Sequence, residues 1–143
     1  NFDTAWDWAT ENGITTDECI TFKSTKGKVP QCPETCDNKS DIIRTKVHNQ
    51  HYVKADQIQE EIYKHGPVTV GFVVYQDFMY YAGGVYIHQK GWFEKFHAVI
   101  FIGCGVENDV PYWLAQNSWT DQWGELGYFK ILRGKDQCEC ESN

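Results

Sequence analysis

The chain has 143 residues, of which 41% are hydrophobic and 15% aromatic, a composition that predicts one compact globular domain with a substantial core. Its formal net charge is −7 and it has no cluster of Lys or Arg, which argues against a partner that presents a phosphate backbone. No apolar run approaches the ~20 residues needed to cross a bilayer, and six cysteines favour an oxidising compartment.

The first dozen residues predict a helix, because their apolar side chains recur at positions i, i+3, i+4 and i+7. These side chains are Phe2, Ala5, Trp6 and Ala9. Gly13 follows as a stop signal. Residues 15–49 then show little periodicity and much Lys, Thr, Pro and Cys. A loop of this length needs cross-links to hold it, and Cys19, Cys32 and Cys36 are placed to supply them.

A second helix is predicted around Ile58 and Ile62, with Asp56 as its N-cap and Gly66-Pro67 as its end. Beyond it, β-branched and aromatic runs separated by Gly, Asp and Asn turns predict strands. The predicted strands are residues 68–75, 85–88, 97–103, 112–117 and 128–132. Such a succession after one helix indicates an antiparallel sheet curled into a half-open barrel.

His97 differs from the other four histidines because it begins a strongly apolar strand. A titratable group there must find a partner or lose stability. By itself the position fits a hydrogen-bonded core histidine better than a functional one. The segment Asn117-Ser118-Trp119, at the end of another apolar strand, changes this weighting. A general base needs a third group to orient its ring, and an amide does so without adding charge, while an indole over that amide keeps water away.

Several motifs resemble the histidine and asparagine segments of the papain family of cysteine proteases. They are His97-Ala98-Val99, Asn117-Ser118-Trp119, Trp123-Gly124 and Gly127-Tyr128-Phe129. Further segments narrow the resemblance to cathepsin B and its relatives, namely Val106-Glu107-Asn108, Pro111-Tyr112-Trp113-Leu114 and the run from Lys130 to Gly134. The match runs through nearly the whole chain in order. It implies an α+β, papain-like fold, with residues 1–50 from the helical domain and residues 51–143 forming the antiparallel half-barrel domain with one helix.

The family's nucleophile lies in a Cys-Gly-Ser-Cys-Trp type segment, and these 143 residues contain no such segment. We therefore expect the chain to be part of a longer polypeptide or one chain of a processed enzyme, and to be inactive alone. By resemblance Cys19 pairs with Cys36, and Cys32 pairs with a cysteine in the amino-terminal half. Cys104 is interpreted as a small buried hydrophobe. Cys138 resembles a free cysteine of cathepsin B, whereas Cys140 departs from that pattern. The two cysteines alone do not make a zinc site, because the partner ligands that zinc needs are missing.

The resemblance implies a cysteine peptidase that works through a thioester and needs no cofactor or metal. In this reading His97 is the base, Asn117 orients it, and Trp119 shields their contact. Four residues are expected to contact substrate, namely Trp119, Trp123, Phe96 and Asn143. Plain core packing is the alternative role for the tryptophans, and Asn143 is expected at the floor of the main specificity pocket.

Cathepsin B carries a loop with a His pair that makes it a carboxydipeptidase. The twelve residues 20–31 hold no His, so an endopeptidase is expected. Expected partners are protein or peptide substrates, the amino-terminal half that carries the catalytic Cys, and cystatin-type inhibitors, with neither nucleic acid nor membrane among them. The expected location is a lysosome, a vacuole or the cell exterior. The alternative function is a non-catalytic papain-like protein used for binding or adhesion. An independently folded binding module is disfavoured, because it would expose the inter-domain face.

Overall fold

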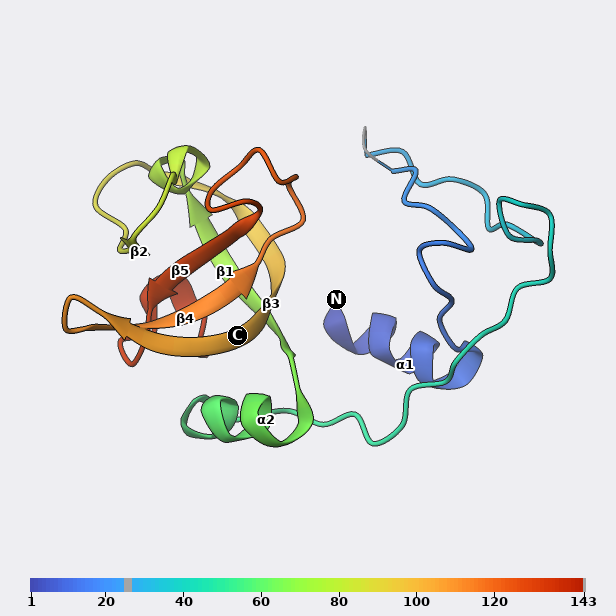
Figure 1. The fold of residues 1–143 in the computed structure, drawn as a ribbon, viewed down its shortest axis with the longest axis horizontal. Helices are drawn as coiled ribbons and strands as arrows, with labels where there is room; N and C mark the ends of the chain where they lie inside the picture. The colour runs from blue at the N-terminus through green and yellow to red at the C-terminus, as the bar shows by residue number, and fades with distance from the viewer. Residues whose placement is uncertain (25–26, 143) are drawn as a thin grey trace. The chain divides into compact units, whose positions relative to one another are not determined.

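The computed structural model describes residues 1–24 and 27–142, and it contains two compact units, Asn1–Tyr52 and Val53–Asn143 (Figure 1). The first unit consists of one helix and a long loop, and the second of a sheet with short helices. Within the described residues, no helix is long and apolar enough to span a membrane.

The predicted first helix is confirmed as α1 (Phe2–Asn12). Asn1 caps it, because its side-chain oxygen accepts a hydrogen bond from the Asp3 amide at 2.9 Å. Gly13 ends it with a φ of 76° and donates its own amide to the Ala9 carbonyl at 3.0 Å. Ala9 is the one residue of α1 that is buried, so most of the predicted apolar face is at least partly exposed in this chain.

A disulfide between Cys19 and Cys36 holds the long loop, as the resemblance predicted. The Asp37 amide donates to the Cys19 carbonyl at 2.7 Å, which ties the two sides of the loop together beside the disulfide. Cys32 is exposed and forms no disulfide within the described chain. Farther on, Ile14 and Thr45 exchange two backbone hydrogen bonds of 2.9 and 2.8 Å and close the base of the loop.

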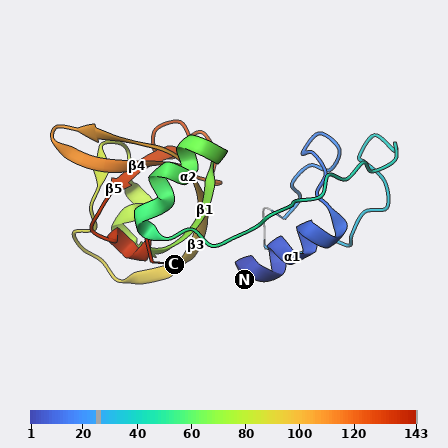
Figure 2. The ribbon, with the colours of Figure 1, turned by 90° about the horizontal axis from the view of Figure 1, so that it is seen from below.

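The second predicted helix forms as α2 (Ile58–His65), but Asp56 is not its N-cap. Asp56 lies inside a 3₁₀ turn, η1 (Ala55–Gln57), that precedes the helix and makes no side-chain cap. The reason is local, since the Gln57 amide already bonds to the Lys54 carbonyl at 2.8 Å. Gly66 ends the helix as predicted, with a φ of 106°. In Figures 1 and 2, α2 lies beside the sheet, where it contacts β1 and β3.

The five predicted strands form one sheet with the order β1-β3-β4-β5-β2. Their bounds are β1 (Val68–Tyr75), β2 (Val85–Tyr86), β3 (Phe93–Glu107), β4 (Val110–Gln116) and β5 (Tyr128–Leu132). β1 and β5 match the prediction in full. β3 is longer than predicted because it pairs with β1 from Phe93 onward and continues to the tight turn into β4.

The sheet is mixed, which corrects the expectation of a wholly antiparallel one. β2 pairs with β5 in parallel, while the other three pairings are antiparallel. A 3₁₀ segment, η2 (Gln76–Tyr80), follows β1 and separates it from β2, so β2 reaches the far edge of the sheet rather than returning beside β1. β2 ends at Tyr86, two residues before the predicted end, and farther on the amides of Gln89 and Lys90 donate to the carboxylate of Asp77 at 2.8 and 3.1 Å.

Aromatic rings fill the core of the second unit. Phe72, Phe78, Phe101 and Phe129 are each at most 1% exposed. Phe78 lies at the centre, with ring centroids of six other aromatic residues between 4.9 and 6.2 Å away. Burying one such side chain contributes about 1.5–3 kcal/mol. A rigid aromatic core therefore underlies the sheet face on which the candidate site lies.

Candidate active site

His97 lies on the core-facing side of β3, at the point where that strand leaves the core. Burial alternates along the strand, with Val99 and Phe101 buried and His97 half-buried on the same face. Its partner across the pairing with β1 is Phe72, whose ring centroid is 5.9 Å from the imidazole. The strand period therefore places the imidazole at the rim of the aromatic core, with one side packed and the other free to receive a ligand.

Asn117 follows the last residue of β4 and meets His97 directly. Its side-chain oxygen Oδ1 lies 2.8 Å from His97 Nε2. The same oxygen accepts a hydrogen bond from the backbone N–H of Ser118 at 2.8 Å. The backbone N–H of Asn117 donates to the Gly127 carbonyl at 2.9 Å. Asn117 is thus fixed by its own backbone and by the neighbouring turn. The structure brings together the two residues that the sequence predicted as a catalytic dyad.

The shared oxygen defines which imidazole nitrogen carries a proton. Because Oδ1 accepts from the Ser118 amide, this end of the side chain is the acceptor and cannot donate to His97. Nε2 must then be the donor, which leaves the lone pair of Nδ1 on neutral His97 available to take a proton. Nδ1 is therefore the nitrogen that can act as a base toward a group outside this unit.

The other end of the Asn117 amide is less well satisfied. Its Nδ2 is buried and has no hydrogen-bond partner within the described residues. A buried donor without a partner costs about 1–3 kcal/mol. The side chain therefore keeps Oδ1 bonded to the imidazole although Nδ2 has no partner among the described residues. Unfavourable features of this kind concentrate at functional positions.

Trp119 covers the dyad and also packs on the core. Its ring stacks on His97, with centroids 5.1 Å apart and planes 28° apart. The same ring meets Phe78 edge to face at 5.6 Å and Trp123 at 4.9 Å. Trp123 in turn donates its indole N–H to the Met79 carbonyl at 3.2 Å. Both tryptophans therefore have a packing role, and Trp119 in addition contacts the imidazole.

The pKa of His97 lies below its ordinary value. Burial lowers it, the hydrogen bond to Asn117 raises it, and the positive charge of Lys95 lowers it, with a net downward shift. The imidazole is therefore neutral at pH 7 when no anion is beside it. A thiolate near Nδ1 would reverse this balance, since an opposite charge favours the protonated ring.

Two further predicted positions are less closely tied to the dyad. Phe96 precedes His97, and strand alternation turns its side chain to the opposite face of β3. Its ring is 68% exposed and meets Phe93 edge to face at 5.3 Å. Asn143, predicted at the floor of the specificity pocket, lies outside the described residues.

The free thiols of the second unit are poor candidates for the nucleophile. Cys138 and Cys140 are buried, and burial raises the pKa of both, whereas an activated cysteine has a lowered pKa. Cys104 is half-buried on β3, less enclosed than the small buried hydrophobe that was expected. It faces α2, where it lines a hollow together with Ile62 and Tyr63. Among the described residues, no group of three or more potential ligands could hold a metal ion.

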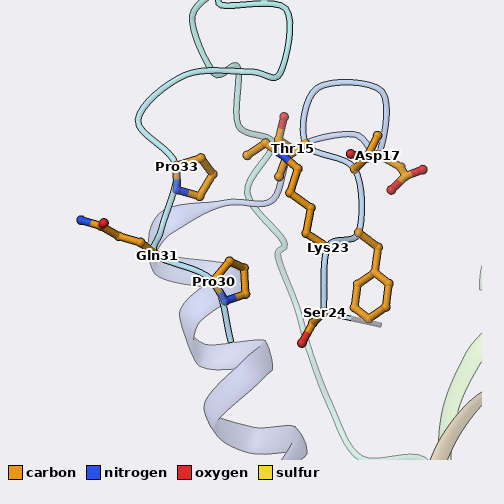
Figure 3. A pocket seen from close by; sticks show the side chains of 10 residues that line it. Thr15, Asp17, Lys23, Ser24, Pro30, Gln31 and Pro33 are labelled. Atoms are coloured by element: carbon orange, nitrogen blue, oxygen red, sulfur yellow. The ribbon is translucent and has the colours of Figure 1, made fainter. Parts of the chain in front are cut away.

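A cavity of about 470 Å³ lies in the loop of the first unit (Figure 3). Its walls come from two loop segments, residues 15–24 and 30–33, and include Lys23, Ser24 and Pro30. Asp37 fixes one of these segments by accepting both the amide and the hydroxyl of Thr21, at 3.2 and 2.7 Å. Among the described residues that line the cavity there is neither His nor Cys, and its titratable side chains are Asp17 and Lys23.

Two residues near the site escaped the sequence reasoning. Lys95 stands two positions before His97, and the strand period of two could have placed it on the same face. Asp77 organises the loop after β2, where it accepts from the Tyr86 hydroxyl at 2.6 Å and from His88 at 3.0 Å. The role of Asp77 could not be predicted from the residues around it, because its partners follow it by nine to thirteen residues.

Comparison with known proteins gives one consistent result. The family model described as "Papain family cysteine protease" matches residues 1–143. "Cathepsin B-like cysteine proteinase 5" of Caenorhabditis elegans is 42% identical over 120 residues, 78% of this chain and 35% of that protein. "Cathepsin B-like CP2" of Giardia intestinalis is 37% identical over 141 residues, 95% of this chain and 47% of that protein.

Among solved structures, "proCathepsin B S9 from Trypanosoma congolense" superimposes with a TM-score of 0.83 and 31% identity. That match covers 97% of this chain and 49% of the trypanosome chain. The chain thus spans less than half the length of each of these three proteins.

Proposed function

The chain belongs to the papain family of cysteine proteases, and on that premise we propose that it supplies the base side of a peptidase site that hydrolyses peptide bonds in proteins. The observation that carries the proposal is the His97–Asn117 hydrogen bond of 2.8 Å, which makes Nε2 the donor and leaves the lone pair of His97 Nδ1 to act as the base. The nucleophilic cysteine comes from a segment outside these 143 residues, in the amino-terminal half of the enzyme.

The chemistry follows from the protonation of His97. Its Nδ1 takes the proton of the cysteine thiol, which leaves a thiolate and an imidazolium. The sulfur attacks the peptide carbonyl carbon, the imidazolium gives its proton to the leaving nitrogen, and the carbon–nitrogen bond breaks to leave a thioester. Neutral Nδ1 then takes a proton from water, the hydroxide attacks the thioester, and the carbon–sulfur bond breaks.

Asn117 supports both steps by holding the ring. Its Oδ1 accepts from Nε2 whether the ring is neutral or charged, so the ring does not turn as Nδ1 gains and loses a proton. Trp119 limits the access of water to this contact, and a lower local dielectric strengthens the ion pair between thiolate and imidazolium.

Substrate contact is proposed for Trp119 and Trp123 on the leaving-group side, for Phe96 in the groove beside His97, and for Asn143 at the floor of the main specificity pocket. Endopeptidase action is proposed because residues 20–31, where cathepsin B has its blocking His pair, contain no histidine. The disulfide between Cys19 and Cys36 supports a lysosomal, vacuolar or secreted location. Cystatin-type inhibitors are the proposed protein partners besides substrates.

The test uses the full-length protein that contains this chain. We expect it to hydrolyse peptide substrates and to be labelled by an active-site-directed epoxide, with both lost in His97→Ala and kept in the surface variant Lys135→Ala. This 143-residue chain alone should do neither. A full-length protein that folds but neither cleaves nor reacts would instead be the non-catalytic binding protein. Labelling of this chain alone would contradict the assignment of the nucleophile to another segment.

A further inference from the structure

The turn after Cys36 carries the sequence Asn38-Lys39-Ser40, which the peptidase chemistry does not use. Asn38 is exposed, and its Oδ1 accepts from both the amide and the hydroxyl of Ser40, at 2.9 and 2.7 Å. The turn is closed by the Lys39 amide on the Cys36 carbonyl at 2.8 Å. Because Oδ1 takes both Ser40 donors, Nδ2 is on the other side of the amide from them.

We propose that Asn38 is a site of N-linked glycosylation. Asn-X-Ser is the acceptor sequence for this modification, and the neighbouring disulfide indicates the oxidising compartment in which the transfer occurs. Nδ2 forms a bond to the anomeric carbon of a lipid-diphosphate-linked oligosaccharide. The carbon–oxygen bond to the diphosphate breaks, the diphosphate leaves with the electron pair, and Nδ2 loses a proton to the transferase. The exposed turn then carries the glycan without unfolding.

The test is secretion of the full-length protein from insect cells. Peptide N-glycosidase should lower its mass and convert Asn38 to Asp in the peptide that contains it. Ser40→Thr keeps the acceptor sequence and should keep the glycan, whereas Ser40→Ala and Asn38→Gln should lose it. An unmodified Asn38 in the parent protein, in a host that glycosylates a reference protein, would overturn the proposal.

A second inference comes from Lys95 and deepens the proposed function, on which it rests. Lys95 and His97 lie on the same face of β3 by alternation. The Lys95 ammonium stands 4.8 Å from the centre of the Trp119 ring, and this ring stacks on His97. No carboxylate pairs with Lys95 in the part of the chain that the structure describes. The positive charge beside the dyad is therefore free to attract an anion.

The Lys95 ammonium lies where the part of a substrate that follows the cleaved bond is expected to pass. His97 Nδ1 gives its proton to the leaving amine, so the residues after the cleaved bond must pass beside the imidazole and Trp119. We infer that Lys95 is a specificity-determining residue that favours an acidic side chain in this leaving segment. Exposed ion pairs are weak, so the expected preference is modest, about fivefold for Glu over Gln and about tenfold for Glu over Lys.

The test compares three peptides that differ only in the first two residues after the cleaved bond, which are Glu, Gln or Lys. In the full-length protein kcat/KM should follow the order Glu, Gln, Lys. Lys95→Met should remove the preference and Lys95→Glu should reverse it. Lys135→Glu, an equal charge change at another exposed lysine, should leave it unchanged. Ratios between peptides cancel the effect of each variant on the His97 pKa.

Binding separates this inference from the proposed function. The three product peptides, which begin with the leaving amine, are titrated against the full-length protein by tryptophan fluorescence. If no peptide is cleaved, the proposed function fails, but tighter binding of the Glu product that is lost in Lys95→Met still supports Lys95. Equal binding and equal cleavage of the three peptides by the parent protein would overturn the inference about Lys95 alone.

Discussion

Replacing Asn117 by Ala removes the only acceptor that the structure gives to His97 Nε2–H among the described residues. During acyl transfer the imidazole is charged, and a hydrogen bond to a charged group contributes about 1.5–3 kcal/mol. Each 1.36 kcal/mol changes a rate tenfold. We therefore expect kcat/KM of the full-length enzyme to fall about 10- to 150-fold in Asn117→Ala.

The same substitution should change stability little. It exposes no core side chain, and it deletes the Nδ2 donor that is buried without a partner. The Ser118 amide, which loses Oδ1, belongs to an exposed residue and can bond to water. Urea unfolding should therefore place Asn117→Ala within about 1 kcal/mol of the parent protein. A catalytic loss together with a retained unfolding midpoint separates positioning of His97 from damage to the fold.

A pH measurement adds a second readout. The hydrogen bond from His97 to Asn117 raises the His97 pKa, so its loss should lower that pKa further. Nuclear magnetic resonance titration of the full-length protein, with its active-site thiol blocked, follows this directly. Because the folded pKa lies below the unfolded value of about 6.5, the associated stability is present above pH ~6.5 and is lost as the pH falls through the folded pKa. Asn117→Ala should extend this loss to lower pH.

Ser118→Ala is the matched control, because it keeps the backbone amide that holds Oδ1 and lies next to the changed residue. It should change neither kcat/KM nor the His97 pKa. A loss of kcat/KM of less than about threefold in Asn117→Ala would contradict a role of this hydrogen bond in catalysis, because it is below the effect of the weakest charged hydrogen bond. An unchanged or raised His97 pKa in that variant would also refute it.

Three other predictions concern the fold around the site, each measured by urea unfolding of the full-length protein. Phe78→Ala should lower the free energy of unfolding by about 3–5 kcal/mol, because Phe78 is fully buried among six rings; a loss below about 1.5 kcal/mol would contradict this packing. Asp77→Asn should be less stable than the parent protein at pH 7, since burial raises the Asp77 pKa but bonds from Tyr86 and the following loop outweigh it and hold the pKa low. This difference should shrink as the pH falls below about 4, where the unfolded Asp takes up a proton, and a gap independent of pH would contradict it. Replacing both Cys19 and Cys36 by Ser should lower the free energy of unfolding by about 3 kcal/mol, the loop entropy of their 17-residue separation. Reducing conditions break the disulfide of the parent protein, so the difference between parent and variant should then disappear. A difference of the same size under reducing conditions would contradict this prediction.

The strands of the second unit could be predicted where an apolar run ends at a strong turn signal. β1 begins after Gly66-Pro67 and β5 after Gly127, and both have the predicted bounds. The strand at β2 was also predicted, but its parallel pairing with β5 could not be, because that pairing joins segments more than forty residues apart. The predicted N-cap of α2, Asp56, was wrong because the same polar residues can begin either a 3₁₀ turn or an α-helix, and the sequence pattern does not distinguish the two.

The contact between His97 and Asn117 could be predicted because each residue lies at one end of an apolar strand and belongs to a family motif. What the sequence could not give is the partner of each atom. The acceptor role of Oδ1 depends on the backbone of Ser118, and the cost at Nδ2 depends on burial. The position of the Lys95 ammonium over Trp119 depends on side-chain conformation, although the period of two already places Lys95 on the right face.

The geometry of the dyad argues for a partner outside this unit. His97 sits half-buried at the rim of the core, and Asn117 holds a buried donor without a partner among the described residues, so keeping these two polar side chains is costly for the fold. An apolar pair at these positions would pack on Phe72 and Trp119 without either cost. A fold that keeps such residues in place gains from them elsewhere, and the open lone pair on Nδ1 is where that gain can arise. Because the sheet holds the dyad without help from a thiol, the dyad is a cost without a return unless a thiol from another segment meets it, and this supports the proposed function.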